Sequence, residues 1–236
     1  MDRFLSEQRL LVIAPHADDE TIGCGGLIAK MKDLGGEVFV QVLTVGDLDH
    51  YDGGEGETRA HTRAEELAEA MKVLGVDDWE ILINDSDQHL RLDRMPRRDL
   101  INLFEREARL ASDRIRPTVI AIPAPSYNQD HVAVYDAAVT ACRPHLAALK
   151  PFQRLVLVAD SPQLAWNPRA FRPNFYVDIS GSYLERKLEA FAKHESQQRP
   201  SPHMGGIDSL RLLALWRGRE ISVDAAEAYE CMRMVV

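Results

Sequence analysis

One stretch of the 236-residue chain decides how the fold is read: Leu10-Leu11-Val12-Ile13-Ala14-Pro15-His16-Ala17-Asp18-Asp19-Glu20. Its first five residues form a continuous apolar run, which is typical of a strand buried on both faces of a sheet. A proline and a cluster of polar side chains follow, and residues 22–34 have a helical pattern that Gly35 and Gly36 end. A buried strand, a polar turn and a helix in this order indicate an α/β protein.

The same alternation of short apolar runs and helical patterns continues along the chain. We expect further strands at residues 38–45, 79–83, 118–122 and 154–159, and further helices at residues 58–75, 100–115 and 132–142. Strands separated by helices of this length form right-handed crossovers and lie parallel. The sequence therefore predicts a single domain over residues 1–236, with a Rossmann-like, mostly parallel sheet and helices on both of its faces.

The pattern loosens after the fifth predicted strand. We expect a strand at 174–180 and helices at 183–194, around 210–216 and around 225–232. The prolines between the fifth and sixth predicted strands suggest an extended crossover. We assign the core sheet, with the polar clusters that follow its strands, to about residues 1–160, and a substrate-shaping role to about residues 161–236.

Composition narrows the class of function. The net charge is -9, which argues against nucleic-acid partners and anionic membranes, because clustered Lys and Arg bind phosphates. No window approaches the ~18 apolar residues of a membrane span, and the first residues lack the apolar core of a signal peptide. The three cysteines are widely spread and support no disulfide framework. We expect a cytoplasmic enzyme of small molecules without a stable membrane anchor.

The polar cluster after the first strand has two interpretations. His16 and the carboxylates of Asp18, Asp19 and Glu20 suit a divalent-metal site with a spare base, and imidazole and carboxylate are ligands that zinc accepts. Alternatively, the carboxylates only stabilise the positive end of the helix that begins here. This cluster by itself leaves both interpretations open.

A second polar cluster, Asn128-Gln129-Asp130-His131, follows the fourth predicted strand. Loops at the carboxyl ends of parallel strands lie at the same edge of the sheet, so His131 can complete a His/Asp/His set with His16 and Asp19. The alternative is that Asn128 or Asp130 only caps a helix. Two His/Asp clusters at corresponding strand ends favour the metal site.

Together these residues resemble the PIG-L/LmbE-like family of zinc-dependent N-acetylglucosamine de-N-acetylases. Residues 15–20 are similar to the family's PHPDDE signature, with Ala17 in place of the usual proline, and residues 128–131 are similar to its HxDH signature. Weaker similarities are spread along the chain, at residues 63–76, 176–180, 187, 194–197 and 226–229. The resemblance covers nearly the whole chain.

The resemblance implies a set of roles. His16, Asp19 and His131 are the expected ligands of one zinc ion per chain, and Asp18 is the expected general base. Asp130 is expected to lie behind the site and orient the base or a ligand. Of the two adjacent carboxylates, Asp19 would thus bind the metal, while Asp18 stays free to accept a proton from water.

Two further residues are expected to bind the substrate. Arg63 resembles the family arginine that contacts substrate, and its alternative is an exposed helix salt bridge to Glu66 or Glu69. Asp47 follows the second predicted strand and is expected to line the rim of the pocket. The loop of residues 47–57 is long enough to act as a lid. We regard His61 and His89 as poor candidates for proton transfer.

Asn128 stands where the family signature begins with a histidine. In the family, that histidine is thought to stabilise the oxyanion or the leaving group. An asparagine amide donates a hydrogen bond, but at neutral pH it takes up no further proton and carries no positive charge. We expect Asn128 to stabilise the oxyanion only, and the alternative is that it is merely an N-cap.

The expected activity is therefore zinc-dependent hydrolysis of the N-acetyl (short acyl) amide of an amino-sugar conjugate, giving acetate and a free amine. One alternative is a Rossmann-like nucleotide-binding protein without hydrolase activity, although the glycines of residues 23–26 lack the full GxGxxG spacing. Another is a metal-poor family member that acts as a binding module. Members of the family commonly form trimers or hexamers, so a homo-oligomer is also expected.

Overall fold

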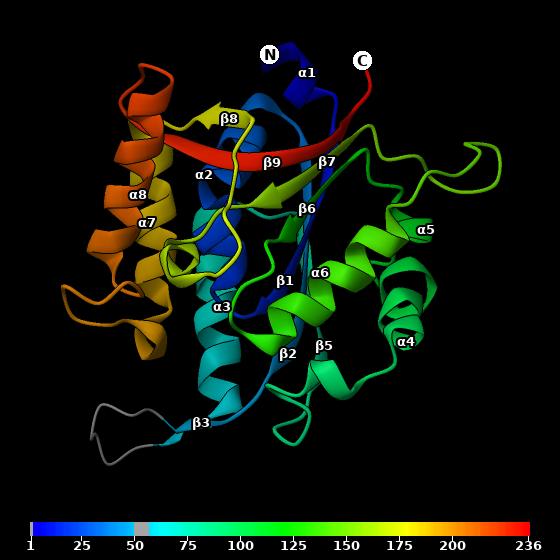
Figure 1. The fold of residues 1–236 in the computed structure, drawn as a ribbon, viewed down its shortest axis with the longest axis horizontal. Coiled ribbons are helices and arrows are strands. Elements are labelled where there is room, and N and C mark those ends of the chain that lie inside the picture. The colour runs from blue at the N-terminus through cyan, green and yellow to red at the C-terminus, as the bar shows by residue number, and fades with distance from the viewer. Residues whose placement is uncertain (1, 50–56) are drawn as a thin grey trace.

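A mostly parallel sheet runs through the molecule (Figure 1). The structure is a computed structural model that describes residues 2–49 and 57–236. Within them the sheet has seven strands, in the order β5 (Asp78–Asn84), β2 (Glu37–Val45), β1 (Arg9–His16), β6 (Val119–Pro123), β7 (Leu155–Ala159), β9 (Ala226–Met234) and β8 (Phe175–Asp178). Strand β9 runs antiparallel to both of its neighbours, β7 and β8, and all other pairs in this sheet are parallel.

Helices cover both faces of the sheet (Figure 1). One face carries α2 (Asp19–Leu34), α3 (Ala60–Leu74), α7 (Ser182–Lys193) and α8 (Ile207–Glu220). The other face carries α4 (Arg97–Asn102), α5 (Ser112–Ile115) and α6 (Gln129–Ala141). Shorter elements are α1 (Asp2–Ser6), the β3 (Leu48–Asp49) and β4 (Glu57–Thr58) pair, the 3₁₀ turns Leu92–Arg94, Pro162–Trp166 and Glu195–Gln197, and the π-helical turn Leu103–Glu107.

The apolar run of β1 explains why helices pack on both faces of the sheet. Because side chains alternate across a strand, Leu10 and Val12 pack into one apolar core while Leu11 and Ile13 pack into the other. All four are almost completely buried. The α/β class and the helices on both faces are thus confirmed.

The strand order also locates the site. From β1 the chain crosses to β2 and β5 on one side, and later to β6 and β7 on the other side. The order therefore reverses between β1 and β6, and ligands of open α/β sheets bind in the crevice beyond the strand ends at such a point. The two predicted polar clusters follow β1 and β6.

Two predicted helices are wrong. Residues 225–232 form strand β9, because pairing with β7 and β8 outweighs the helix propensity of their alanines and glutamates. The helix expected at 100–115 is divided into α4, a π-helical turn and α5. After the turn, the carboxylate of Glu80 accepts the N–H groups of Arg109 and Leu110, a tertiary contact that periodicity does not reveal.

Other boundaries also differ from the expectation. The sheet extends past the boundary predicted near residue 160, because β8 and β9 complete it. Of the predicted lid, residues 50–56 lie outside the described residues.

Two predicted helix ends are confirmed. Gly35 and Gly75, with φ of 92° and 74°, end α2 and α3 as predicted. No described helix has both the length and the apolar character of a bilayer span.

Candidate active site

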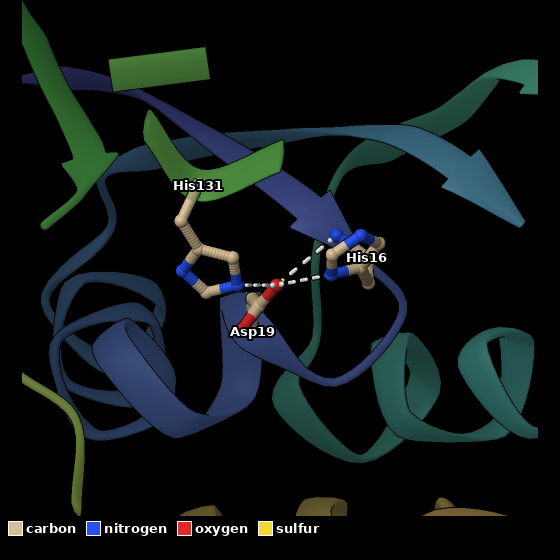
Figure 2. Close-up of side chains that lie close together, drawn as sticks. All are labelled: His16, Asp19 and His131. Carbon is tan, nitrogen blue, oxygen red and sulfur yellow. Dashed lines mark hydrogen bonds and ion pairs between the residues drawn. The ribbon is translucent and has the colours of Figure 1, made fainter. Parts of the chain in front are cut away.

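Three side chains from the two polar clusters meet beyond the ends of β1 and β6, where the strand order reverses (Figure 2). His16 ends β1, Asp19 begins α2, and His131 lies in the first turn of α6. Asp19 Oδ2 lies 3.4 Å from His16 Nδ1 and 3.2 Å from His131 Nε2. Their potential ligand atoms all lie within 4.8 Å of one another. The structure thus brings together the three residues expected to bind the metal.

This group suits a zinc-sized ion. With metal–ligand bonds of about 2.0–2.1 Å, two donors of a tetrahedral site lie about 3.4 Å apart. Both separations from Asp19 are close to that value. Two imidazoles and one carboxylate are also a donor set of catalytic zinc sites, which leave one position for water or substrate.

Asp130 fixes the orientation of His16. Its Oδ2 lies 3.0 Å from His16 Nε2, and its Oδ1 accepts the Leu92 N–H at 2.9 Å. An Nε2–H donated to this buried carboxylate leaves Nδ1 free to face the metal position. Burial alone would lower the pKa of His16, but the hydrogen bonds to Asp130 and Asp19 raise it to about 9.

Asp18, the expected base, lies at the N-terminus of α2 in a strained conformation. Its φ of 130° and ψ of -30° are rare for a residue other than glycine. Burial and the charge of Asp19 raise the pKa of Asp18 to about 7, although His194 and Arg63 oppose the shift. A half-buried carboxyl group that exchanges its proton near neutral pH suits general acid–base catalysis.

Two buried residues that sequence reasoning did not assign hold Asp18 in place. Glu20 Oε2 accepts the Asp18 N–H at 3.0 Å, and Glu20 Oε1 lies 3.1 Å from His194 Nε2. Both side chains are fully buried, and His194 Nδ1 has no hydrogen-bond partner among the described residues. His194 follows α7, and its ring contacts Glu20 on the helix that carries the site.

Arg63 is buried beside the site. It donates to Gly46 O at 3.2 Å and to His89 Nε2 at 2.8 Å. The exposed salt bridge considered for Arg63 is wrong, because Glu66 binds Ser196 and Glu69 pairs with Lys72.

His89, expected to be a poor candidate for proton transfer, lies beside the site. Its ring lies 5.3 Å from the ring of His16, and its Nδ1 lies 2.7 Å from Thr44 Oγ1. Burial and the charges of His16 and Arg63 lower the pKa of His89 to about 3, so it is neutral. Its Nε2 therefore accepts the Arg63 N–H, and His89 positions Arg63 rather than transferring protons. His61 is exposed and faces Glu65.

Asp47 and Asn128 both make capping contacts. Asp47 Oδ1 accepts the Ala60 N–H at 2.7 Å at the start of α3, and Asn128 Oδ1 accepts the Asp130 N–H at 2.9 Å at the start of α6. The Asn128 contact is the N-cap considered above, and it uses the amide oxygen while the amide N–H groups are the donors that an oxyanion needs. Substrate binding by Asp47 and oxyanion stabilisation by Asn128 remain predictions.

The glycines of α2 serve packing. A Cβ on Gly23 would lie 2.9 Å from Ala159 Cβ, and one on Gly26 would lie 2.6 Å from Ile179 Cγ2. The turn before them is filled by the His16 and Asp19 cluster. A nucleotide-binding glycine loop is therefore not favoured.

The sequence is similar to a known family of proteins. The family model of the GlcNAc-PI de-N-acetylases, PIG-L, matches residues 11–142. A diacetylchitobiose deacetylase of Thermococcus kodakarensis is 31% identical over 225 residues, which cover 92% of this chain and 80% of that protein.

Solved structures extend the similarity to the whole fold. The conserved protein TT1542 from Thermus thermophilus has a TM-score of 0.74 at 27% identity, over 97% of this chain and 96% of that chain. The N,N′-diacetylchitobiose deacetylase from Pyrococcus horikoshii has a TM-score of 0.68 at 24% identity, over 95% of this chain and 84% of that chain. Sequence and fold lead to one conclusion: the chain belongs to the PIG-L family of GlcNAc-PI de-N-acetylases.

Proposed function

We propose that the chain is a zinc-dependent deacetylase that hydrolyses the N-acetyl amide of an amino-sugar conjugate. One observation carries the proposal: the buried His16–Asp19–His131 group lies next to the half-buried carboxyl group of Asp18. Family membership supplies the sugar, because the Thermococcus relative is named for its action on diacetylchitobiose.

His16, Asp19 and His131 would hold the ion, one per chain. A zinc ion supplies Lewis-acid chemistry, since it makes water more acidic and polarises an amide carbonyl. Asp18 accepts a proton from the attacking water and gives it to the nitrogen of the breaking C–N bond. The water oxygen ends on the acyl carbon, so the products are acetate and a free amine.

The remaining residues orient these groups. Asp130 holds His16 through Nε2, while Glu20 and His194 fix the backbone of Asp18. Arg63, held by His89, supplies positive charge beside the site, where it suits the hydroxyl groups or an anionic group of the substrate. Asn128 is proposed to donate a hydrogen bond to the oxyanion.

The location and assembly of the protein are part of the proposal. The free cysteines Cys24, Cys142 and Cys231 agree with a reducing cytoplasm. A homotrimer or homohexamer is expected from the family resemblance, and light scattering of the purified protein tests it.

Metal-dependent acetate release tests the activity. Metal-free protein is reconstituted with zinc and incubated with N-acetylglucosamine and N,N′-diacetylchitobiose, and acetate and free amine are measured together. The proposal expects equal amounts of both products, with zinc required and Asp18→Asn nearly inactive. Zinc-free binding of a nucleotide without hydrolysis of either sugar would contradict it.

A further inference from the structure

A small hollow borders the metal-ligand group. Its lining includes Asp19 and His131. The rest of its wall is more apolar than polar: Ile22, Gly23, Pro123, Ala124, Ala159 and Leu164 lie beside Ser126, Asp160 and Ser161. Its volume is about 20 Å³. About 10–15 Å³ is needed to admit one water molecule, so the hollow has room for a single methyl-sized group.

A second side of the metal-ligand group, at His16, is polar. His16 faces His89 there, and His89 binds Arg63. Neither Arg63 nor His89 lines the small hollow. Because a methyl group prefers apolar walls and a sugar ring prefers hydrogen-bonding groups, the two halves of an N-acetyl sugar match the two sides.

A larger hollow of about 170 Å³ adjoins the small one. It is lined by Tyr135, Asn167 and Phe171 and shares Ala124 and Leu164 with the small hollow. These two shared residues form the partition between the hollows, and Leu164 contributes the larger side chain. The partition limits the depth available next to Asp19 and His131.

The backbone around Leu164 is held independently of its side chain. The Leu164 N–H donates to Ser161 O at 3.0 Å, and the Asn167 N–H donates to Leu164 O at 3.1 Å. Asn167 Nδ2 also donates to Pro125 O at 2.8 Å. Shortening the half-buried side chain of Leu164 would therefore remove the partition without moving the segment that carries it.

We propose that the small hollow receives the methyl group of the acetyl substituent, and that Leu164 determines the length of the acyl group. This inference rests on the proposed deacetylase function. With Leu164 in place, each additional methylene of the acyl chain meets its side chain. When that side chain is shortened, a longer acyl chain extends into the larger hollow.

A series of acyl substrates tests the inference. N-acetyl-, N-propionyl- and N-butyrylglucosamine are supplied to the zinc-loaded enzyme, and release of glucosamine gives kcat/KM. The parent is expected to lose about 10–200-fold with each added methylene. Leu164→Ala should raise the butyryl-to-acetyl ratio of kcat/KM by at least about tenfold, which is the value of one methylene. Leu146→Ala, at a leucine that is 72% exposed, is the matched control and should leave the ratio unchanged.

The other outcomes separate the two proposals. A parent enzyme that releases acetate but hydrolyses the butyryl amide equally fast overturns the acyl pocket while the deacetylase function stands. An unchanged ratio in folded Leu164→Ala overturns the role of Leu164. If that variant does not fold, Leu164→Val, tested with the propionyl substrate, replaces it under the same criterion. Absence of hydrolysis with every substrate overturns the proposed function and this inference together.

Discussion

Helix α2 carries two polar clusters, one at its first turn and one at its middle, and they differ in how well their groups are paired. At the middle, Glu227 accepts the N–H groups of Gly26 and Leu27 at 2.8 and 2.7 Å, while Lys187 donates to Ile22 O at 2.7 Å. Tyr229 Oη lies 3.2 Å from Gly23 O. In a regular helix the carbonyl groups of residues 22 and 23 would accept the N–H groups of residues 26 and 27. Here each of these four backbone groups contacts an inserted side chain instead.

In this middle cluster the buried polar groups are paired with one another. Lys187 and Glu227 are 2.6 Å apart, both are almost fully buried, and Tyr229 lies 2.8 Å from the same carboxylate. The first turn, by contrast, has a strained Asp18 and two histidines that share Asp19. Complete pairing stabilises a fold, whereas converging donors beside a strained, half-buried carboxyl group leave room for a metal and a substrate. How completely the polar groups are paired, rather than how deeply they are buried, distinguishes the functional cluster from the structural one.

The largest loss of activity is expected at a metal ligand. His131→Ala removes one of three donors, so zinc content should fall well below one ion per chain and acetate release should fall to background. Mass spectrometry of the metal content, beside the activity assay, checks this. His61→Ala, at a histidine whose side chain is 78% exposed, is the control. Full zinc content in His131→Ala would show that α6 contributes no ligand.

Removing the base should separate chemistry from metal binding. Asp18→Asn keeps the shape of the side chain, so zinc content should stay near that of the parent while kcat falls by about 10²–10⁴-fold. Steady-state kinetics and metal analysis of the same preparation check it, with the exposed Asp113→Asn as control. Turnover close to that of the parent would remove Asp18 from the mechanism.

The middle cluster should respond in stability instead. Glu227→Ala leaves Lys187 buried without its partner, which typically costs about 3–5 kcal/mol. Denaturant unfolding of metal-free protein measures this loss, and the folded fraction should still bind zinc. A variant as stable as the parent would show that this ion pair does not hold α2.

Asn128 gives the smallest expected effect on stability and a clear effect on turnover. Loss of an oxyanion donor lowers kcat by about 10²–10³-fold, whereas loss of an N-cap lowers the free energy of unfolding by about 1 kcal/mol. Because the Oδ1 atom caps α6, Asn128→Ala should lose stability in any case. Asn128→Asp keeps the acceptor and removes the amide donor, so it should keep stability and lose turnover. Full turnover in Asn128→Asp would show that Asn128 serves only as the N-cap of α6.

Local patterns predicted the parts of the fold that depend on local sequence. The apolar run before His16 and the cluster at residues 128–131 predicted β1, β6 and the meeting of His16, Asp19 and His131, because adjacent parallel strands share one edge. Strand β9 was missed because its alanines favour a helix, and only its position between β7 and β8 makes it a strand.

The supporting residues of the site could not be predicted in the same way. His89 follows β5 in a loop without a motif, and only packing brings it to His16 and Arg63. Glu20 and His194 are 174 positions apart in sequence, so their contact is a property of the tertiary structure. The PHADDE stretch did contain Glu20, yet its role depends on the strained backbone of Asp18, which a sequence does not display.

Anomalous X-ray diffraction at the zinc edge, from crystals of the zinc-loaded protein, tests the central claim most directly. The account predicts one strong peak per chain within bonding distance of His16 Nδ1, Asp19 Oδ2 and His131 Nε2, and its loss in His131→Ala. A peak elsewhere, or no peak at this group in an enzyme that still releases acetate, would contradict the account.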